Sequence, residues 1–185
     1  MGKYATSTYN FNTYRNVDYR ARFWREGGAQ QNQLLVRASG SILSDGSYAN
    51  AYYFLYNRNG SYSVWKRVGG VWTALKSWTA SSYIAKGSAW NELRAYVSGP
   101  SLRLYINGNL VWSGTDYSLS SGRVGLGMYK SISSDQLWVD YATLTCLSGA
   151  GEEAGEVDFG EISAEQQELN EAADANPIGN EKGPR

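Results

Sequence analysis

The stretch WNELRAYVSGPSLRLYINGNLVWSG, residues 90–114, followed by GRVGLGMY at residues 122–129, decides the fold. Apolar and polar residues alternate along its two arms, and the apolar set is Leu93, Ala95, Val97, Leu102, Leu104 and Ile106. Alternation with a period of two indicates β-strands that bury one face. Gly99-Pro100 separates the two arms, and Asn107-Gly108 can supply the two positive φ angles of a type I′ hairpin turn. The stretch therefore predicts antiparallel strands joined by tight turns.

The same alternation, with a turn signal every 8–12 residues, continues along most of the chain. Asn59-Gly60 and Gly69-Gly70 are predicted as tight hairpins and Asp45-Gly46 as a loop turn. No helical segment separates the strands as a parallel sheet would require. We therefore predict an all-β protein with strands at residues 4–9, 17–24, 33–38, 51–56, 61–68, 71–78, 91–98, 101–106, 110–113, 123–129 and 136–145.

A family resemblance lies in the last third of this strand region. The residues that carry it are Trp90, Leu93, Arg94, Leu102, Tyr105, Asn107, Gly108, Asp116, Gly122, Val124, Gly125, Leu126 and Asp140. Their spacing resembles laminin-G-like and glucanase-like members of the concanavalin A-like lectin superfamily, over roughly residues 17–145. The resemblance implies a two-sheet antiparallel jelly-roll sandwich. It implies less about function, because that sandwich carries lectins, adhesion modules, glycosidases and structural domains.

Composition divides the chain into a sandwich at residues 1–147 and an acidic tail, rich in Gly, Glu and Ala, at residues 148–185. The chain has no histidine and one cysteine, which excludes Ser-His-Asp and Cys-His catalysis and zinc sites with histidine ligands. No apolar run approaches the ~20 residues of a membrane span. The first residues lack the features of a signal peptide. An extracellular surface or a virion is the expected location.

Charge is divided in the same way. Residues 1–150 hold 15 basic and 7 acidic residues, a net charge of +8, and residues 151–185 hold 2 and 10, a net charge of −8. This favours anionic partners for the sandwich, or contact between a sandwich and a tail. The basic residues are spread over many strands without a nucleic-acid motif, so nucleic acid is not the expected partner.

The tail is predicted to contain one short helix at residues 163–175. Ser163 can cap this helix with Gln166 three residues later, as in a capping box. A helix this short and polar frays when isolated. We expect the tail to dock on a neighbouring subunit through its large apolar residues, Phe159, Ile162 and Leu169.

One motif in the tail matches catalytic chemistry. EVDFGE, Glu156–Glu161, fits the ExDxxE spacing of retaining glucanases that share the sandwich fold. There, alternate positions of a central strand direct two carboxylates at the sugar. Here the motif follows the sandwich and is flanked by glycine and glutamate. We interpret it as a chance match and predict that the chain is not an enzyme.

Two surfaces are candidate glycan sites. On the hairpin around Gly69-Gly70, the pairing predicts one face with Trp65, Arg67, Trp72 and Trp78. Tryptophan rings stack on sugar rings, and a neighbouring arginine can bind hydroxyls or a carboxylate. Alternatively, these tryptophans pack under a loop or against another subunit.

The second surface lies on the hairpin at residues 91–106. Arg94, Tyr96, Arg103 and Tyr105 are predicted to point away from the core. Arginine interleaved with tyrosine can bind an acidic polysaccharide. The same residues also fit a solvated face of ordinary cross-strand pairs.

No cofactor is expected, apart from a structural calcium ion to which Asp116, Asp135 or Asp140 would each give one oxygen. The sequence thus favours a non-catalytic glycan-binding or adhesive module. The alternative is a structural subunit of an assembly, such as a virion decoration protein, a fibre protein or a surface filament.

Overall fold

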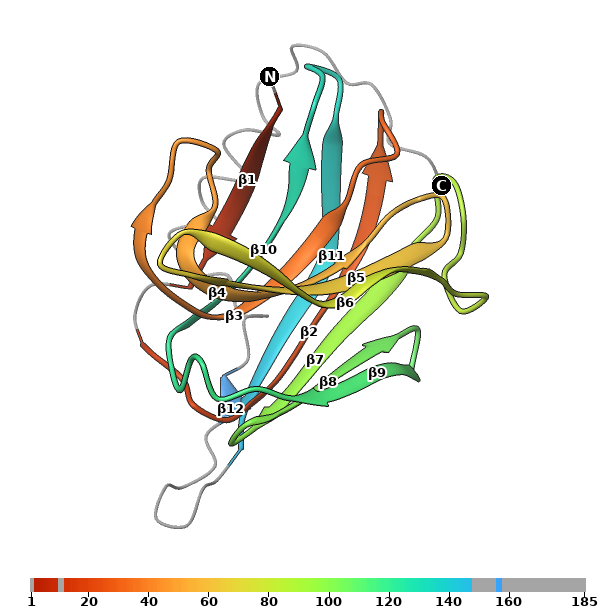
Figure 1. Cartoon of the computed structure of the whole chain (residues 1–185). Coiled ribbons are helices and arrows are strands. Elements are labelled where there is room, and N and C mark those ends of the chain that lie inside the picture. Colours follow the sequence, from red (N-terminus) through yellow and green to blue (C-terminus); the bar gives the residue numbers. More distant parts are fainter. Residues whose placement is uncertain (1, 10–11, 148–155, 158–185) are drawn as a thin grey trace, which may run out of the picture.

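The computed structural model describes residues 2–9, 12–147 and 156–157, which form two antiparallel sheets packed face to face (Figure 1). The first sheet has the order β1 (Lys3–Thr8), β10 (Arg123–Lys130), β3 (Asn32–Ile42), β4 (Tyr48–Tyr56), β5 (Ser61–Val68) and β6 (Val71–Ala80). The second has the order β12 (Glu156–Val157), β11 (Gln136–Cys146), β2 (Val17–Glu26), β7 (Asn91–Ser98), β8 (Ser101–Ile106) and β9 (Asn109–Thr115). The predicted all-β sandwich is confirmed.

The described residues contain no helix, and so none long and apolar enough to cross a membrane. The predicted tail helix at residues 163–175 lies outside the described residues. Within the sandwich, each predicted strand corresponds to an observed one.

The main core lies between the two sheets. Phe23, Leu93 and Leu104 of the second sheet meet Leu34 and Phe54 of the first, and all five are fully buried. The apolar positions of β7 and β8 identified by alternation all belong to this core. Burial of this apolar surface is the main force that holds the sheets together.

A second apolar cluster covers the outer face of the first sheet, which points away from the second sheet. It consists of Leu35, Ala38, Tyr48, Ala51, Tyr53 and Leu55, with Trp65 and Trp72 packed against it. The β3–β4 hairpin, orange in Figure 1, curls over part of this face. Its loop is held where the Tyr4 amide donates to the Asp45 carbonyl and the Gly70 amide to the Ala49 carbonyl. This hairpin forms a wall beside the exposed remainder of the face.

Two of the predicted turns have the expected geometry. Asn107 and Gly108 have φ angles of +49° and +80°, and Gly69 and Gly70 have +58° and +83°. These values fit type I′ turns. At Asn59-Gly60, β4 and β5 are joined by a four-residue loop at residues 57–60, which the predicted strand bounds already left between them. The Asn57 side chain shapes this loop by accepting hydrogen bonds from the amides of Asn59 and Ser61.

Glycine allows β1 to lie close against β10. A Cβ atom on Gly127 would stand 2.1 Å from the carbonyl oxygen of Ala5, which is far inside van der Waals contact. The absence of a side chain at Gly127 therefore lets β1 pair with β10 and brings Tyr4 to the outer face of the first sheet.

Candidate functional site

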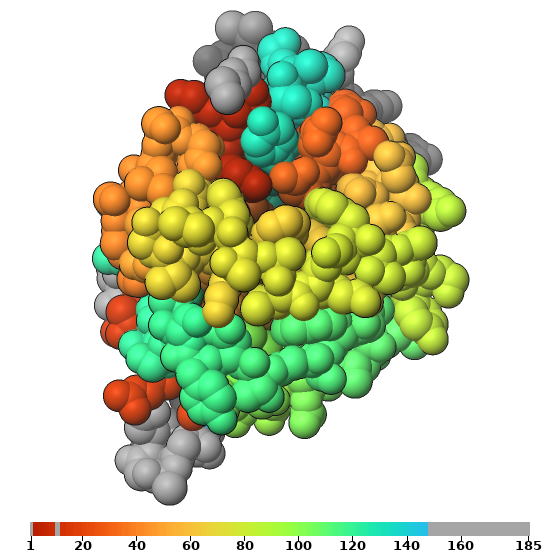
Figure 2. Space-filling view, in the orientation of Figure 1, coloured from red at the N-terminus to blue at the C-terminus, as the bar shows by residue number. Residues whose placement is uncertain are grey.

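A groove on the outer face of the first sheet is lined mainly by aromatic rings. It has a volume of about 280 Å³ and is lined by Tyr4, Gln31, Leu55, Trp65, Trp72 and Trp78, a set that we call the aromatic groove. Figure 2 shows the yellow β5–β6 hairpin beside the red N-terminal strand, with the surface hollowed between them. Three of the four residues predicted for the first glycan surface line this groove.

The pairing of β5 with β6 brings the three tryptophans to one face. Arg67 pairs with Trp72 and Trp65 with Ala74, as the Gly69-Gly70 turn predicts. Two irregularities then follow, and together they add two residues to β6 between Ala74 and Thr79. An even insertion preserves the side on which later residues lie, because side chains alternate with a period of two. Trp78 therefore returns to the face that holds Trp72.

Trp72 is the centre of the aromatic cluster. Its ring centroid lies 4.7 Å from that of Tyr53, 5.9 Å from Tyr4 and 6.4 Å from Trp65, with the Trp65 ring nearly perpendicular at 89°. Trp65 and Trp72 are half-buried, whereas Trp78 is 43% exposed. Part of Trp72 thus packs against the outer cluster, and Trp65 and Trp78 offer the freer ring surface.

Arg67 does not have the exposure that the sequence suggested. It is 8% exposed, and its Nη1 lies 2.8 Å from Oδ2 of Asp45 in the β3–β4 hairpin. Its Nε donates to the Gly70 carbonyl, and its guanidinium lies 4.8 Å from the Trp72 ring centroid. Burial raises the pKa of Asp45, but hydrogen bonds from Ser47 and the charge of Arg67 lower it more. Arg67 therefore fixes the wall and the Trp72 ring instead of facing a ligand.

Polar groups at the groove come from strands that are distant in sequence. The Gln31 side chain donates to the Tyr4 hydroxyl at 3.3 Å. Gln33 pairs with Leu55, and its Oε1 is buried without a hydrogen-bond partner among the described residues. Sequence patterns did not identify Tyr4, Gln31 or Leu55, because only the sheet order β1-β10-β3-β4-β5-β6 brings them beside the tryptophans.

The second predicted surface lies on the outer face of the second sheet, but its residues engage one another. Arg94 pairs with Tyr105 and Tyr96 with Arg103, and each guanidinium lies over the partner ring at 4.9 and 5.6 Å. Arg94 also forms a bidentate ion pair with Asp18, which raises the pKa of Arg94. The arrangement is that of cross-strand pairs on a solvated face. Arg103 alone of the four is exposed, and the other three are half-buried.

The three carboxylates considered for calcium lie apart, each beside its own cation. Asp116 pairs with Lys66 at 2.6 Å, Asp135 with Arg25 at 3.2 Å and Asp140 with Arg22 at 2.8 Å. Within the described part of the chain, no group of three acidic or cysteine side chains could hold a metal ion. The structure thus does not bring these carboxylates together around one ion.

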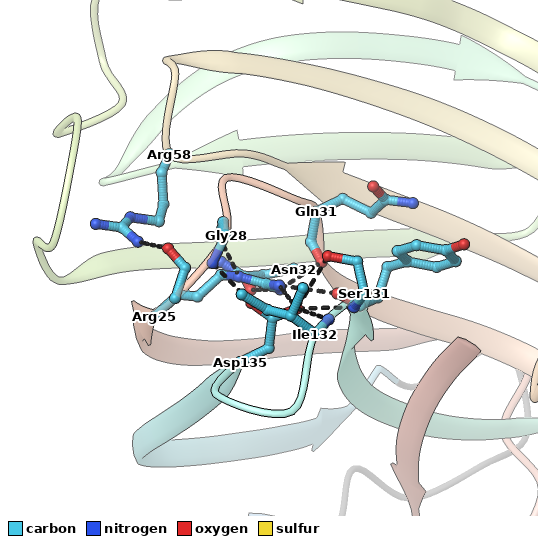
Figure 3. Close-up of polar contacts among 10 residues, drawn as sticks. Arg25, Gly28, Gln31, Asn32, Arg58, Ser131, Ile132 and Asp135 are labelled. Carbon is cyan, nitrogen blue, oxygen red and sulfur yellow. Dashed lines mark hydrogen bonds and ion pairs between the residues drawn. The ribbon is translucent and has the colours of Figure 1, made fainter. Parts of the chain in front are cut away.

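Asp135 belongs to the buried ionic cluster drawn in Figure 3. Its carboxylate accepts hydrogen bonds from the amides of Gly28, Ser131 and Ile132 at 2.7, 2.7 and 3.1 Å. Arg25, fully buried, also donates to the carbonyls of Gly28, Gln31 and Tyr129. The cluster therefore has a structural role, because it ties β2 to the segments before β3 and β11.

Most of the tail residues singled out in the sequence lie outside the described residues. These are Phe159, Ile162 and Leu169, together with the last four positions of the EVDFGE motif. The first two positions form β12, which pairs with Leu144 and Thr145 of β11.

The chain matches no family model and no curated protein. Solved structures do match in fold. The carbohydrate-binding module CBM66 of Bacillus subtilis aligns with a TM-score of 0.60 at 15% identity, over 78% of this chain and 91% of that one. Sheep galectin-11 aligns with a TM-score of 0.53 at 9% identity, over 78% and 98%. The chain therefore has the concanavalin A-like lectin and glucanase fold that the sequence suggested.

The prediction that this chain is not an enzyme has to be corrected. A β-glucanase of Bacillus licheniformis aligns with a TM-score of 0.50 at 12% identity, over 67% of this chain and 57% of that one. A glycosidic hydrolase also shares the fold, with a TM-score of 0.53 at 11% identity. The position and the flanking residues of the EVDFGE motif were too narrow a ground for excluding an enzyme, because hydrolases and lectins are built on this same sandwich.

Proposed function

We propose that the chain binds a glycan in the aromatic groove of the first sheet. The observation that carries the proposal is the set of three tryptophans and one tyrosine around a single groove. Apolar ring faces of this kind stack on the apolar faces of sugar rings. The carbohydrate-binding module and the galectin of the same fold support the choice of ligand.

The polar groups of the groove suit a ligand rich in hydroxyls. The Tyr4 hydroxyl and the Gln31 side-chain amide both line it, and they are joined by a hydrogen bond of 3.3 Å. A hydroxyl and an amide can each donate to and accept from sugar hydroxyls. Small sites commonly combine such apolar walls with a few placed polar groups.

Replacing Trp65 or Trp78 with alanine should weaken glycan binding by about 1–3 kcal/mol, by analogy with the range for a nucleic-acid base stacked on an aromatic side chain. That corresponds to a roughly 5- to 150-fold increase in Kd. A glycan array identifies the sugar, and titration calorimetry on the purified variants gives the affinities.

Trp138→Ala is the matched control, since Trp138 is 49% exposed on β11 in the other sheet. Unchanged binding in Trp65→Ala and Trp78→Ala would disprove the groove and direct attention to the face of Arg94 and Arg103. The length of the oligosaccharide recovered after binding shows whether hydrolysis takes place: an intact chain indicates binding alone, and a shortened chain indicates cleavage.

We further propose, as a second role, that the acidic tail docks on a basic sandwich of a neighbouring copy. The division of charge into +8 and −8 supports this. Exposed ion pairs each contribute only ~0–1 kcal/mol, so Phe159, Ile162 and Leu169 would supply the specificity. Light scattering should show an oligomer that weakens as salt shortens the Debye length below ~10 Å and that Phe159→Ser disrupts at low salt. A full-length chain that stays monomeric at high concentration would refute this role.

A further inference from the structure

A second pocket, of about 290 Å³, lies at one end of the sandwich and shares no lining residue with the aromatic groove. Its walls come from the segment before β2, from β3, from the β7–β8 turn and from the segment between β9 and β10. These segments lie together at the lower left of Figure 1. Arg15, Arg37, Pro100, Asp116 and Tyr117 are among its lining residues, and we call it the Arg37 pocket.

Arg37 occupies an irregularity in β3. Its φ angle is +55°, in the left-handed region that residues other than glycine rarely adopt. Val36 belongs to the core between the sheets and Ala38 to the outer cluster, so the alternation of the strand is broken at Arg37. Strained positions of this kind cluster at ligand clamps and active sites.

The buried guanidinium of Arg37 has no acidic partner in the part of the chain that the structure describes. The side chain is 3% exposed, and it donates to the carbonyls of Arg15, Leu119 and Gly99 at 2.6, 2.7 and 2.6 Å. Carbonyl oxygens satisfy its donors but do not neutralise its charge. No carboxylate among the described residues forms an ion pair with it. Burial lowers the pKa of Arg37, Tyr52 partly offsets this, and the positive charge of Arg15 lowers it further.

Asp116, the one acidic residue among the described residues that line the pocket, is already neutralised. Asp116 pairs with Lys66 at 2.6 Å and accepts hydrogen bonds from the Tyr52 hydroxyl at 2.7 Å and the Ser118 amide at 2.8 Å. The pocket thus contains two guanidinium groups that repel each other and one carboxylate that is balanced elsewhere. Its net charge is positive, and an anion would relieve the repulsion.

We propose that the Arg37 pocket binds the carboxylate of an acidic sugar. Arg15 is exposed at the rim and forms no ion pair with the described residues, so it can form a charge-assisted hydrogen bond with the carboxylate, while the buried charge of Arg37 attracts it. Tyr117, 83% exposed, offers an aromatic face for the sugar ring beside Pro100. This site is independent of glycan binding in the aromatic groove, and neither proposal depends on the other.

The test is a titration of the full-length, ¹⁵N-labelled chain with trigalacturonate, and with its methyl ester as a control of the same shape without charge. We expect the amide signals of Gly99, Tyr117 and Ser120 to shift with the acid and not with the ester. Arg15→Gln should raise Kd about tenfold, the loss of one charge-assisted contact. Lys130→Gln, which removes an exposed cation of β10 outside the lining of the pocket, should leave Kd unchanged. Arg37 is not the variant of choice, because it holds three loops together.

The proposal is overturned if neither compound shifts these signals, if the ester acts like the acid, or if Arg15→Gln binds as well as the wild type. A further arm replaces the glutamates of residues 152–171 with glutamine in the full-length chain. If trigalacturonate shifts the signals only in that variant, the carboxylates of the chain itself occupy the pocket, and the sugar is rejected as its ligand. Loss of binding in Arg15→Gln but not in Trp78→Ala keeps this site distinct from the aromatic groove.

Discussion

Replacing Asp135 with alanine is expected to destabilise the sandwich by about 3–5 kcal/mol, the typical cost of removing one partner from a buried ion pair. Arg25 would remain fully buried with its charge unbalanced. The amides of Gly28, Ser131 and Ile132 would lose the acceptor that they share. Urea unfolding followed by tryptophan fluorescence measures the change as a lower midpoint.

Asp140→Ala is the matched control for this prediction. Asp140 also pairs with an arginine of β2, but both side chains of that pair are more than two-fifths exposed. Exposed pairs contribute only ~0–1 kcal/mol, so the midpoint should hardly move. Equal effects of the two substitutions would show that the buried cluster does not hold the sandwich as described.

The strands were predictable because their burial is local in origin. Side chains of β7 and β8 lie alternately on the core face and on the solvent face. The apolar residues Leu93, Ala95, Leu102 and Leu104 occupy the core positions, so the sequence pattern alone predicts the strands. The outer ends of β3 and β4, at residues 39–42 and 48–50, were not predicted, since residues 39–50 are mostly small and polar. This part of the hairpin is ordered by contacts with Tyr4 and Gly70, which are far away in the sequence.

The residues of the candidate sites were likewise predicted only where they lie on one hairpin. The face shared by Trp65 and Trp72 follows from the Gly69-Gly70 turn, which fixes the register of β5 and β6. The burial of Arg67 depends on Asp45 from another hairpin, so alternation alone gave the wrong exposure. Arg37 was missed because an irregularity within β3 leaves no periodic signal. Sequence patterns therefore identify side chains on one hairpin, and only the tertiary fold assembles a site from several.

Acid should destabilise the protein through Asp116 and Asp135. Burial raises the pKa of each carboxyl, but hydrogen bonds lower it more, from Lys66 and Ser118 for Asp116 and from backbone amides for Asp135. Both pKa values therefore lie well below the ordinary value of about 3.9. At low pH the unfolded chain binds protons that the folded chain does not. The stabilisation is fully present above about pH 5 and is lost progressively as the pH falls through 4 and below.

Each of these carboxyl groups should contribute about 2 kcal/mol of this pH-dependent stability. Solvent screens these interactions only weakly, because the side chain of Asp116 is 12% exposed and that of Asp135 is 0% exposed. Urea midpoints measured from about pH 7 to about pH 2.5 should fall along this course. Asp116→Asn and Asp135→Asn should each be less stable at neutral pH and show a shallower fall. A wild-type midpoint that stays constant down to the lowest pH would contradict the lowered pKa values, because a folded state that binds as many protons as the unfolded state has no such dependence.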